Sequence, residues 1–522
     1  MNRFIKYGRN LGANWFGLFA NMLVLFYLSP FVINTLGKVE YGIWSLLTVF
    51  TGYLGILDLG VKASTGRYVT LYIGKNDYKS ADEVIRTSLT FFGLLSLLIF
   101  FVSVVLGFMF PLFFKSIPSD YYLLIKILLP ALALNIWATT LRALVASVLV
   151  AHDRFDFINI IDFAVLMLRT IATVVVLKAG YGIIGLTGVV ILCNILGFIL
   201  TYFVSKKIWG FLRLLPWYFS SRRLKQLFGY GVAAFLSSVA MKVIGQTDLI
   251  LVGSFISVSA VTVYSVGAMM VYYSTNFVGF IGITFFPPVQ RAVAQKKYGE
   301  VKWLYRRQVR LALIFGIPLY VGFITFSEDF IRLWMLSDNF PLMSVIQASQ
   351  IMIILSVSKI FYVFTLGSKE VLNASGSVKI SSTISVIEAV LNLLISFILV
   401  YFFEYGLLGV ALGTLVARIF VSSIAFPYYV CKKLGLSKTQ FIKDIYLRGM
   451  IAIVCFMTVC ILVKECLPVD NWVMFWLDVL IVLAFFVPIS ILILVPKDFL
   501  KIFREQINQK VLKKVKKKLQ KG

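Results

Sequence analysis

Histidine and acidic side chains are scarce in this chain of 522 residues. It has one histidine, His152, and 23 aspartates and glutamates against 50 lysines and arginines. A single histidine excludes histidine-rich metal chemistry, and the sequence contains no GxxxxGK[ST] phosphate loop. The five cysteines form no close CxxC pair and lie in or beside apolar runs, which favours small hydrophobic side chains over disulfides or metal ligands. We therefore predict no metal and no other cofactor.

Charged residues make up only 14% of the chain, whereas hydrophobic residues make up 60%, and the mean hydropathy is +0.92. A soluble protein of this size could not cover so much apolar surface. The apolar runs repeat at lengths of about 20 residues, which matches the roughly 30 Å hydrocarbon core of a bilayer. Lipid cannot satisfy open backbone groups, so each run must be helical. The sequence predicts an all-α polytopic membrane protein.

Fourteen spans are expected, and the charges indicate their orientation. With both termini in the cytoplasm, the cytoplasmic segments hold 39 of the 50 lysines and arginines, the outer loops six and the spans five. This asymmetry is what the positive-inside rule requires. The expected spans begin near residues 11, 42, 88, 122, 157, 182, 228, 258, 309, 343, 380, 405, 447 and 472.

Two basic segments carry much of the formal net charge of +27. Residues 206–226 interleave aromatic and basic side chains, which predicts an amphipathic cytoplasmic linker lying on the inner leaflet. Residues 497–522 form a basic cytoplasmic tail. Both segments are suited to anionic membrane lipids, and we expect no nucleic acid as a partner.

An internal repeat divides the chain. Tyr181-Gly182-Ile183-Ile184-Gly185 recurs as Tyr405-Gly406-Leu407-Leu408-Gly409, and Arg67 and Arg291 are separated by the same offset. Such duplication predicts two six-helix lobes with a substrate site between them. The expected lobes are 1–205 (spans 1–6) and 227–433 (spans 7–12), and spans 13–14 over 434–496 stand outside the repeat.

Several short motifs carry a family resemblance. They are Ser29-Pro30, Leu36-Gly37, Tyr41-Gly42, Asp58-Leu59-Gly60, Arg67-Tyr68-Val69 and Asp248-Leu249-Ile250-Leu251-Val252-Gly253. This set resembles the polysaccharide transporter (Wzx-like oligosaccharide flippase) family of the MOP superfamily, which also contains the MATE drug exporters and the lipid flippase MurJ.

The resemblance implies a MATE/MurJ-like pair of lobes related by a pseudo-two-fold axis, and it implies a transporter rather than an enzyme. Its implied cargo is an undecaprenyl-diphosphate-linked oligosaccharide, moved to the outer leaflet by alternating access. That step serves surface polysaccharide synthesis, such as O-antigen, capsule or exopolysaccharide, in the bacterial cytoplasmic membrane. Polymerase and chain-length proteins of the same pathway are the implied protein partners.

Intramembrane cations mark the expected path of an anionic head group. A lysine or arginine at a helix centre costs about 2.5–3.5 kcal/mol on insertion scales, so it should face a cavity or a partner. Lys242 with Gln246 one turn on is the foremost diphosphate contact. The alternative for each cation is a structural ion pair or an inner-leaflet anchor. The substrate-binding candidates are Lys62, Arg142, Lys242, Gln246, Lys359, Arg418, Arg67 and Arg291.

Acidic groups in the spans are the candidates for coupling or gating. Asp58 and Lys62 are spaced i, i+4, which predicts a local ion pair that anionic cargo could open. Asp162 and Arg169 share a helix face, and a structural pair within the lobe is the alternative there. Glu388 lies one turn from Asn392 and could serve a cation site. The coupling and gating candidates are Asp58, Asp162, Arg169, Asp248 and Glu388.

The membrane potential favours export of an anion. Each negative charge moved outward across an inside-negative 100 mV gains about 2.3 kcal/mol, so a diphosphate with two charges gains about 4–5 kcal/mol. We therefore expect potential-driven flipping, with H⁺ or Na⁺ counter-transport as a further coupling. Two other functions fit less well. A MATE-like drug or cation antiporter should favour acidic cavities, and a membrane polysaccharide polymerase or ligase usually has a large outer loop.

Overall fold

The computed structural model describes residues 3–213 and 218–495. Within these ranges every regular element is a helix, and an isolated bridge joins Ser337 to Phe340. The predicted all-α fold is therefore confirmed for the described residues. The predicted tail 497–522 lies outside them, as do residues 214–217 of the predicted linker.

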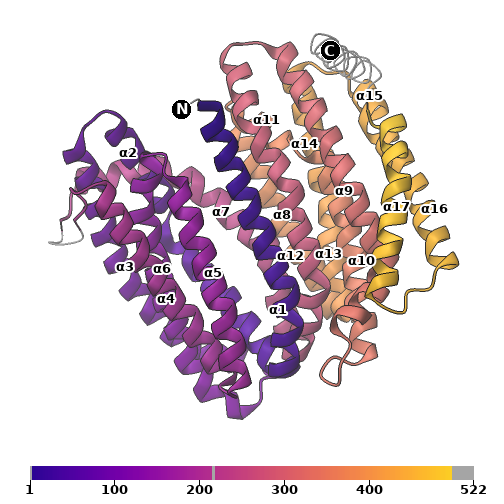
Figure 1. The fold of residues 1–522 in the computed structure, drawn as a ribbon, viewed down its shortest axis with the longest axis horizontal. Helices are drawn as coiled ribbons and strands as arrows, with labels where there is room; N and C mark the ends of the chain where they lie inside the picture. Colours follow the sequence, from indigo (N-terminus) through magenta and orange to yellow (C-terminus); the bar gives the residue numbers. More distant parts are fainter. Residues whose placement is uncertain (1–2, 214–217, 496–522) are drawn as a thin grey trace, which may run out of the picture. The chain divides into compact units, whose positions relative to one another are not determined.

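The helices follow one another with short turns between them (Figure 1). In chain order they are α1 (Arg3–Leu54), α2 (Val61–Gly74), α3 (Tyr78–Phe113), α4 (Tyr122–Ala151), α5 (Phe155–Lys178), α6 (Gly182–Ile208), α7 (Ser221–Phe255), α8 (Val258–Ala294), α9 (Tyr298–Met335), α10 (Leu342–Thr365), α11 (Ser368–Ala374), α12 (Val378–Tyr401), α13 (Gly406–Ala417), α14 (Ser423–Leu434), α15 (Lys438–Phe441), α16 (Arg448–Cys466) and α17 (Trp472–Ile493). Two π-helical turns, Arg418–Ser422 and Ile442–Leu447, join α13 to α14 and α15 to α16.

Twelve helices in the described ranges are long and apolar enough to cross a membrane. The predicted number of fourteen is therefore approximate. One difference is the segment Ala20–Asp58, which joins the first expected span to the start of the second across a kink at Gly37, where φ is 75°. The other is α7, which carries Lys242 and Asp248 and is not among the twelve. The chain is a multi-pass membrane protein.

The structure differs from the surface helix expected over the linker. Helix α6 ends at Ile208, and residues 209–213 and 218–220 are not helical. Trp209 at 4% exposure and Leu212 at 1% are buried in a core cluster with residues of α2, α3 and α4, whereas Phe211 is 60% exposed and Phe219 is 51% exposed. The segment therefore divides its apolar side chains between the core and the surface, and its described residues before α7 do not form the interfacial helix.

The chain divides into two compact units. The first comprises the residues up to Gly267, Trp334–Ile351 and Ser385–Thr414. The second comprises Ala268–Leu333, Met352–Ile384 and the residues from Leu415 onward. These units do not follow the expected lobes, because α7 and the start of α8 group with the N-terminal helices. The predicted lobes 1–205 and 227–433 and the separate segment 434–496 therefore stay a prediction.

The first unit presents an apolar stripe along α3. Large side chains recur three or four residues apart on one face of this helix, and each is more than half exposed. They are Leu94, Leu97, Phe101, Val105, Phe108 and Leu112. A continuous apolar stripe of this length suits contact with lipid tails rather than water. The opposite face packs on α4, which in turn packs on α6 (Figure 1).

The internal repeat is visible in the backbone of two turns, one before α6 and one before α13. Gly182 and Gly406, the second residues of the repeated pentapeptide, both have positive φ, 49° and 52°. Each begins a helix, α6 or α13. The residues two positions before them, Gly180 and Glu404, are also left-handed. The same sequence therefore forms the same tight turn in both halves, which supports a duplication at the level of local structure.

The family motif Tyr41-Gly42 has a packing reason that can be tested. A Cβ atom at Gly42 would lie 2.1 Å from the carbonyl oxygen of Val258, so α1 and the start of α8 touch through bare backbone. We expect Gly42→Ala to destabilise the protein by about 1–3 kcal/mol or more, because this contact cannot relax without moving a helix. Thermal unfolding in detergent measures the effect.

Gly66→Ala is the matched control for this change, since no atom lies within 4 Å of a Cβ at Gly66. That variant should unfold at or above the wild-type temperature, because alanine favours helix. Equal melting temperatures for Gly42→Ala and the wild type would contradict the packing argument.

Candidate functional site

A polar seam runs between α1 and α7 in the first unit. A Cβ atom on Gly52 would lie 2.7 Å from Gln246 Oε1 and 3.1 Å from Lys242 Nζ, so glycine at this position makes room for both side chains. Tyr53 follows, and its hydroxyl lies 2.7 Å from Thr247 Oγ1 and donates to the carbonyl oxygen of Lys242 at 3.4 Å. The structure therefore brings the predicted pair Lys242 and Gln246 together on one face of α7.

Lys242 has no acidic partner in the part of the chain that the structure describes, and its side chain is half-buried. Gln246 Oε1 is buried and, among the described residues, accepts no hydrogen bond. A buried amide oxygen without a donor, beside an ammonium without a counter-ion, is costly inside a membrane protein unless a ligand or water completes the pair. Together they offer charge and hydrogen-bond donors to a phosphate.

Asp248 lies at the centre of a second polar cluster in the first unit, and it is 1% exposed. Its Oδ2 accepts from the Tyr264 hydroxyl at 2.7 Å and from Thr414 Oγ1 at 3.1 Å. Asn392 Nδ2 donates to the same threonine hydroxyl at 2.7 Å, while Asn392 Oδ1 is buried and accepts no hydrogen bond from any described residue. Carboxylate, hydroxyl and amide oxygens from α7, α12 and α13 therefore gather in one buried place, and hard cations prefer such oxygen ligands.

Glu388, the other predicted coupling acid, is on α12 one turn before Asn392 and is 4% exposed. The i, i+4 spacing predicted for these two residues is therefore realised on one continuous helix. Buried acids on a membrane helix are expensive and mark functional or structural networks.

A third cluster lies between α4, α5 and α6. Arg142 pairs with Asp162, and its Nε donates to Thr201 Oγ1 at 3.2 Å. The predicted partner of Asp162, Arg169, instead donates to Asn194 at 3.3 Å. Residues seven apart share a helix face but are separated by about 10 Å of rise, which is too far for an ion pair, so Arg142 on the neighbouring helix takes that place. Asp162 therefore forms an ion pair between neighbouring helices, as the structural alternative predicted, but its partner is Arg142 and not Arg169.

The predicted i, i+4 pair of Asp58 and Lys62 is wrong. The helix breaks between them, because Leu59 and Gly60 are both left-handed with φ of 51° and 76°. The Asp58 carboxylate accepts from the N–H of Gly60, two residues further along the chain, at 2.9 Å. Lys62, at the start of α2, is exposed. The Asp-Leu-Gly motif therefore forms a helix break, and Asp58 stabilises the turn.

Two of the predicted cations of the second unit, Lys359 and Arg418, lie against aromatic rings. Lys359 is 6% exposed with its Nζ 5.2 Å from the ring centre of Tyr272, and Arg418 is 8% exposed with its guanidinium 5.6 Å from that of Tyr362. Buried cation–π contacts of this kind contribute on the order of 2 kcal/mol. Both residues are thus held at fixed places inside the unit.

The paired arginines of the repeat are both exposed. Arg67 lies over the ring of Tyr68 at 5.7 Å, and Arg291 donates to the carbonyl oxygen of Pro287 at 3.4 Å. Arg67 lies midway along α2, and Arg291 lies near the end of α8. Their exposure suits a membrane anchor or a first contact with an anionic head group.

Comparison with known proteins identifies the family of this chain. Residues 35–345, more than half of the chain, match the family described as polysaccharide biosynthesis protein. The chain belongs to this family. Among curated relatives, a Shigella flexneri protein named as an O-antigen transporter is 22% identical over 412 residues, which cover 78% of this chain and 93% of the relative.

Two solved structures share the fold of this family member. The lipid II flippase MurJ in an inward closed conformation aligns with a TM-score of 0.69 and 19% identity, over 94% of this chain and 98% of MurJ. An inward-facing multidrug MATE transporter of the MOP superfamily aligns with a TM-score of 0.70 and 13% identity, over 79% of this chain and 94% of the transporter. The predicted MATE/MurJ-like fold is confirmed.

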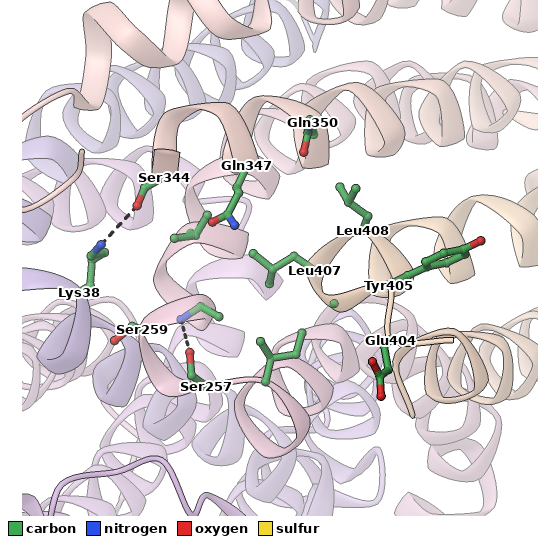
Figure 2. Close-up of a pocket in the computed structure, with 14 residues that line it drawn as sticks. Lys38, Ser257, Ser259, Ser344, Gln347, Gln350, Glu404, Tyr405, Leu407 and Leu408 are labelled. Carbon is green, nitrogen blue, oxygen red and sulfur yellow. Dashed lines mark hydrogen bonds between the residues drawn. The ribbon is translucent and has the colours of Figure 1, made fainter. Parts of the chain in front are cut away.

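Sequence reasoning missed one polar pocket in this family member. It is a cavity of about 480 Å³ in the first unit, and its walls include Lys38, Gln347 and Glu404 (Figure 2). The repeated pentapeptide that begins at Tyr405 forms part of its wall, but nothing in the sequence indicates that four separate parts of the chain meet there.

Proposed function

We propose that this protein is a flippase that moves lipid-linked oligosaccharide repeat units across the membrane for surface polysaccharide synthesis. Family membership supports a place in polysaccharide biosynthesis, and the relative named for O-antigen transport supports a glycan cargo. The MurJ-like fold is compatible with a lipid-linked substrate. The cargo we infer carries an undecaprenyl diphosphate, an anionic head on a long apolar tail.

The observation that carries this proposal is the Lys242–Gln246 pair on α7. Because no described acidic group neutralises Lys242, its charge is available to an anion that enters the protein. Gln246 places its side-chain amide one turn from Lys242, in the space that the missing side chain of Gly52 leaves open. We assign this pair to the diphosphate, whose oxygens accept charge-assisted hydrogen bonds.

Coupling to a cation is the second part of the proposal. The oxygens of Asp248, Asn392 and Thr414 form a set that could hold H⁺ on the carboxylate or Na⁺ among the three groups. Entry of a cation here would add to the drive that the membrane potential supplies for outward movement of the diphosphate. The protein then needs no nucleotide.

The cellular setting follows from the same inference. We place the protein in the bacterial cytoplasmic membrane with both termini in the cytoplasm, as the distribution of lysine and arginine favours. Anionic lipids contact its basic segments. Polymerase and chain-length proteins of the pathway are the proposed downstream partners.

A drug or cation antiporter is the second candidate, and the MATE-like fold is the observation that favours it. The unneutralised Lys242 argues against a cationic substrate at that position, since like charges repel in a low-dielectric setting. The family match also points to polysaccharide rather than drug export.

Complementation of a strain that lacks its own oligosaccharide flippase tests the proposal. Expression of the protein should restore surface polymer, measured by gel electrophoresis and immunodetection of the polymer. Normal membrane abundance without any restored polymer, across strains with several different repeat units, would reject the flippase assignment. Drug efflux from vesicles without lipid-linked sugar transport would support the antiporter instead.

A further inference from the structure

A polar pocket lies at the end of the first unit where four parts of the chain meet (Figure 2). Lys38 comes from α1 directly after the kink at Gly37. The turn between α7 and α8, the first turns of α10 and the turn between α12 and α13 supply the other walls. The cavity volume of about 480 Å³ falls in the range of about 300–1,000 Å³ that small-molecule sites occupy.

Hydroxyl and amide groups dominate the polar lining. Ser257 and Ser259 come from the turn into α8, and Gln347 and Gln350 from α10, where both glutamines are exposed. An amide side chain carries two donors and an acceptor, and a hydroxyl can both donate and accept. Such groups match a ligand whose own surface is a series of hydroxyls.

Two opposite charges face the same cavity. Lys38 Nζ donates to Ser344 Oγ at 3.3 Å, and within the described ranges no carboxylate lies within ion-pairing distance of it. Ser344 is 5% exposed, so the lysine is anchored to a fixed hydroxyl (Figure 2). Glu404 stands in the turn before α13 with φ of 54°. A residue other than glycine in this conformation is uncommon, and such strain often accompanies functional positions.

Apolar groups complete the wall next to Glu404. Leu407 is 9% exposed, whereas Tyr405 is 55% exposed. A sugar ring has apolar C–H faces as well as hydroxyls, and an exposed aromatic ring can cover such a face. The pocket therefore combines amides, hydroxyls, one cation, one anion and an aromatic surface.

We propose that this pocket is a saccharide-binding site that takes one sugar residue, with preference for a sugar that carries a carboxylate. Gln347 and Gln350 bind ring hydroxyls, Lys38 binds the carboxylate and Glu404 accepts from a hydroxyl. The proposal rests on the proposed function, because the sugar belongs to the glycan being exported. The positive-inside count puts this end of the helices on the outer side, where the glycan would arrive.

A phospholipid head group is the other source of an anionic polar ligand. A phosphate would find one cation here, and Glu404 would repel it. The amides and hydroxyls would also remain without partners. The lining therefore favours a sugar.

Saturation-transfer NMR on the full-length protein in detergent tests the site. The probes are glucose, glucuronic acid and glycerol 1-phosphate, each offered separately. We expect transfer to both sugars, with glucuronic acid about threefold stronger than glucose. Gln347→Leu/Gln350→Leu should lower transfer to both sugars about threefold or more. Lys38→Gln should remove the preference for glucuronic acid and leave glucose unchanged.

Gln295→Leu is the matched control, because Gln295 is an exposed glutamine outside the pocket. Its spectra should equal those of the wild type. Transfer to neither sugar, or equal transfer in the wild type and the double variant, would overturn the site. Stronger transfer to glycerol 1-phosphate than to either sugar, lost in Lys38→Gln, would overturn it in favour of a head-group site.

Failure of the site and failure of the proposed function are separable. If the wild type restores surface polymer in the complementation assay but binds neither sugar, the pocket assignment fails and the flippase assignment stands. If it binds sugar in the pocket but restores no polymer, the flippase assignment fails.

Discussion

Replacement of Lys242 by alanine should lower surface polymer roughly tenfold or more without lowering the amount of protein in the membrane. A hydrogen bond to a charged group contributes about 1.5–3 kcal/mol, and 1.4 kcal/mol is a factor of ten. Because Lys242 has no described acidic partner, its removal leaves no buried carboxylate without a counter-ion. The loss should therefore appear in transport and not in stability. Complementation and immunoblotting of the same membranes measure both.

Lys379→Ala provides the matched control, since Lys379 is an exposed lysine at the start of α12. It should retain wild-type polymer. Lys242→Arg should retain part of the activity, because it keeps the charge but changes its geometry. Wild-type polymer levels in Lys242→Ala would remove this residue from the substrate path.

Replacement of Asp248 by asparagine should abolish the response of the protein to its coupling cation. Asparagine keeps the size and one acceptor oxygen but removes the charge on which Tyr264 and Thr414 converge. A cation that binds only the folded protein stabilises it by about 2.7 kcal/mol at a hundred times its dissociation constant. If the coupling ion is Na⁺, we therefore expect Na⁺ to raise the unfolding temperature of the wild type and not that of Asp248→Asn. If the coupling ion is H⁺, we expect an inward proton gradient to speed flipping by the wild type and not by Asp248→Asn.

Two readouts distinguish the ions in this experiment. Thermal unfolding in NaCl against KCl reports Na⁺ binding, and flipping in vesicles with and without a pH gradient reports proton coupling. Asp338→Asn, at an exposed acid after α9, is the matched control and should behave as the wild type. If Asp248→Asn responds to both ions as the wild type does, the Asp248 cluster is not the coupling site.

The sequence was sufficient for the fold and for part of the site because a few physical signals are strong. Apolar runs of membrane length and the asymmetry of lysine and arginine predict spans. Helical spacing correctly put Lys242 beside Gln246 and Glu388 beside Asn392, since each pair lies on an uninterrupted helix.

Helical spacing failed where the chain is not helical. Asp58 and Lys62 have the spacing of a helical pair, yet two left-handed residues separate them. Sequence also could not tell which helix supplies the partner of Asp162, because ion pairs between helices depend on packing rather than on spacing along one chain. Arg142, twenty positions away, was the residue within reach.

The pocket beside Lys38 was unpredictable for a related reason. Its walls come from turns between α7 and α8 and between α12 and α13, from α10 and from the kink in α1. None of these segments carries a recognisable binding motif by itself. Only the folded arrangement places the two exposed glutamines opposite a lysine and a glutamate (Figure 2).

Reconstitution of the purified protein in liposomes most directly tests whether Lys242 serves an anionic lipid-linked sugar. Liposomes would contain an undecaprenyl-diphosphate-linked oligosaccharide, and a sugar-modifying enzyme added outside would report its arrival in the outer leaflet. We predict that the rate at which the lipid-linked sugar reaches the outer leaflet rises when the membrane potential drives anions outward, toward the enzyme. We also predict that this rate falls roughly tenfold in Lys242→Ala. A flipping rate of the wild type equal to that of protein-free liposomes, or equal to that of Lys242→Ala, would contradict the account.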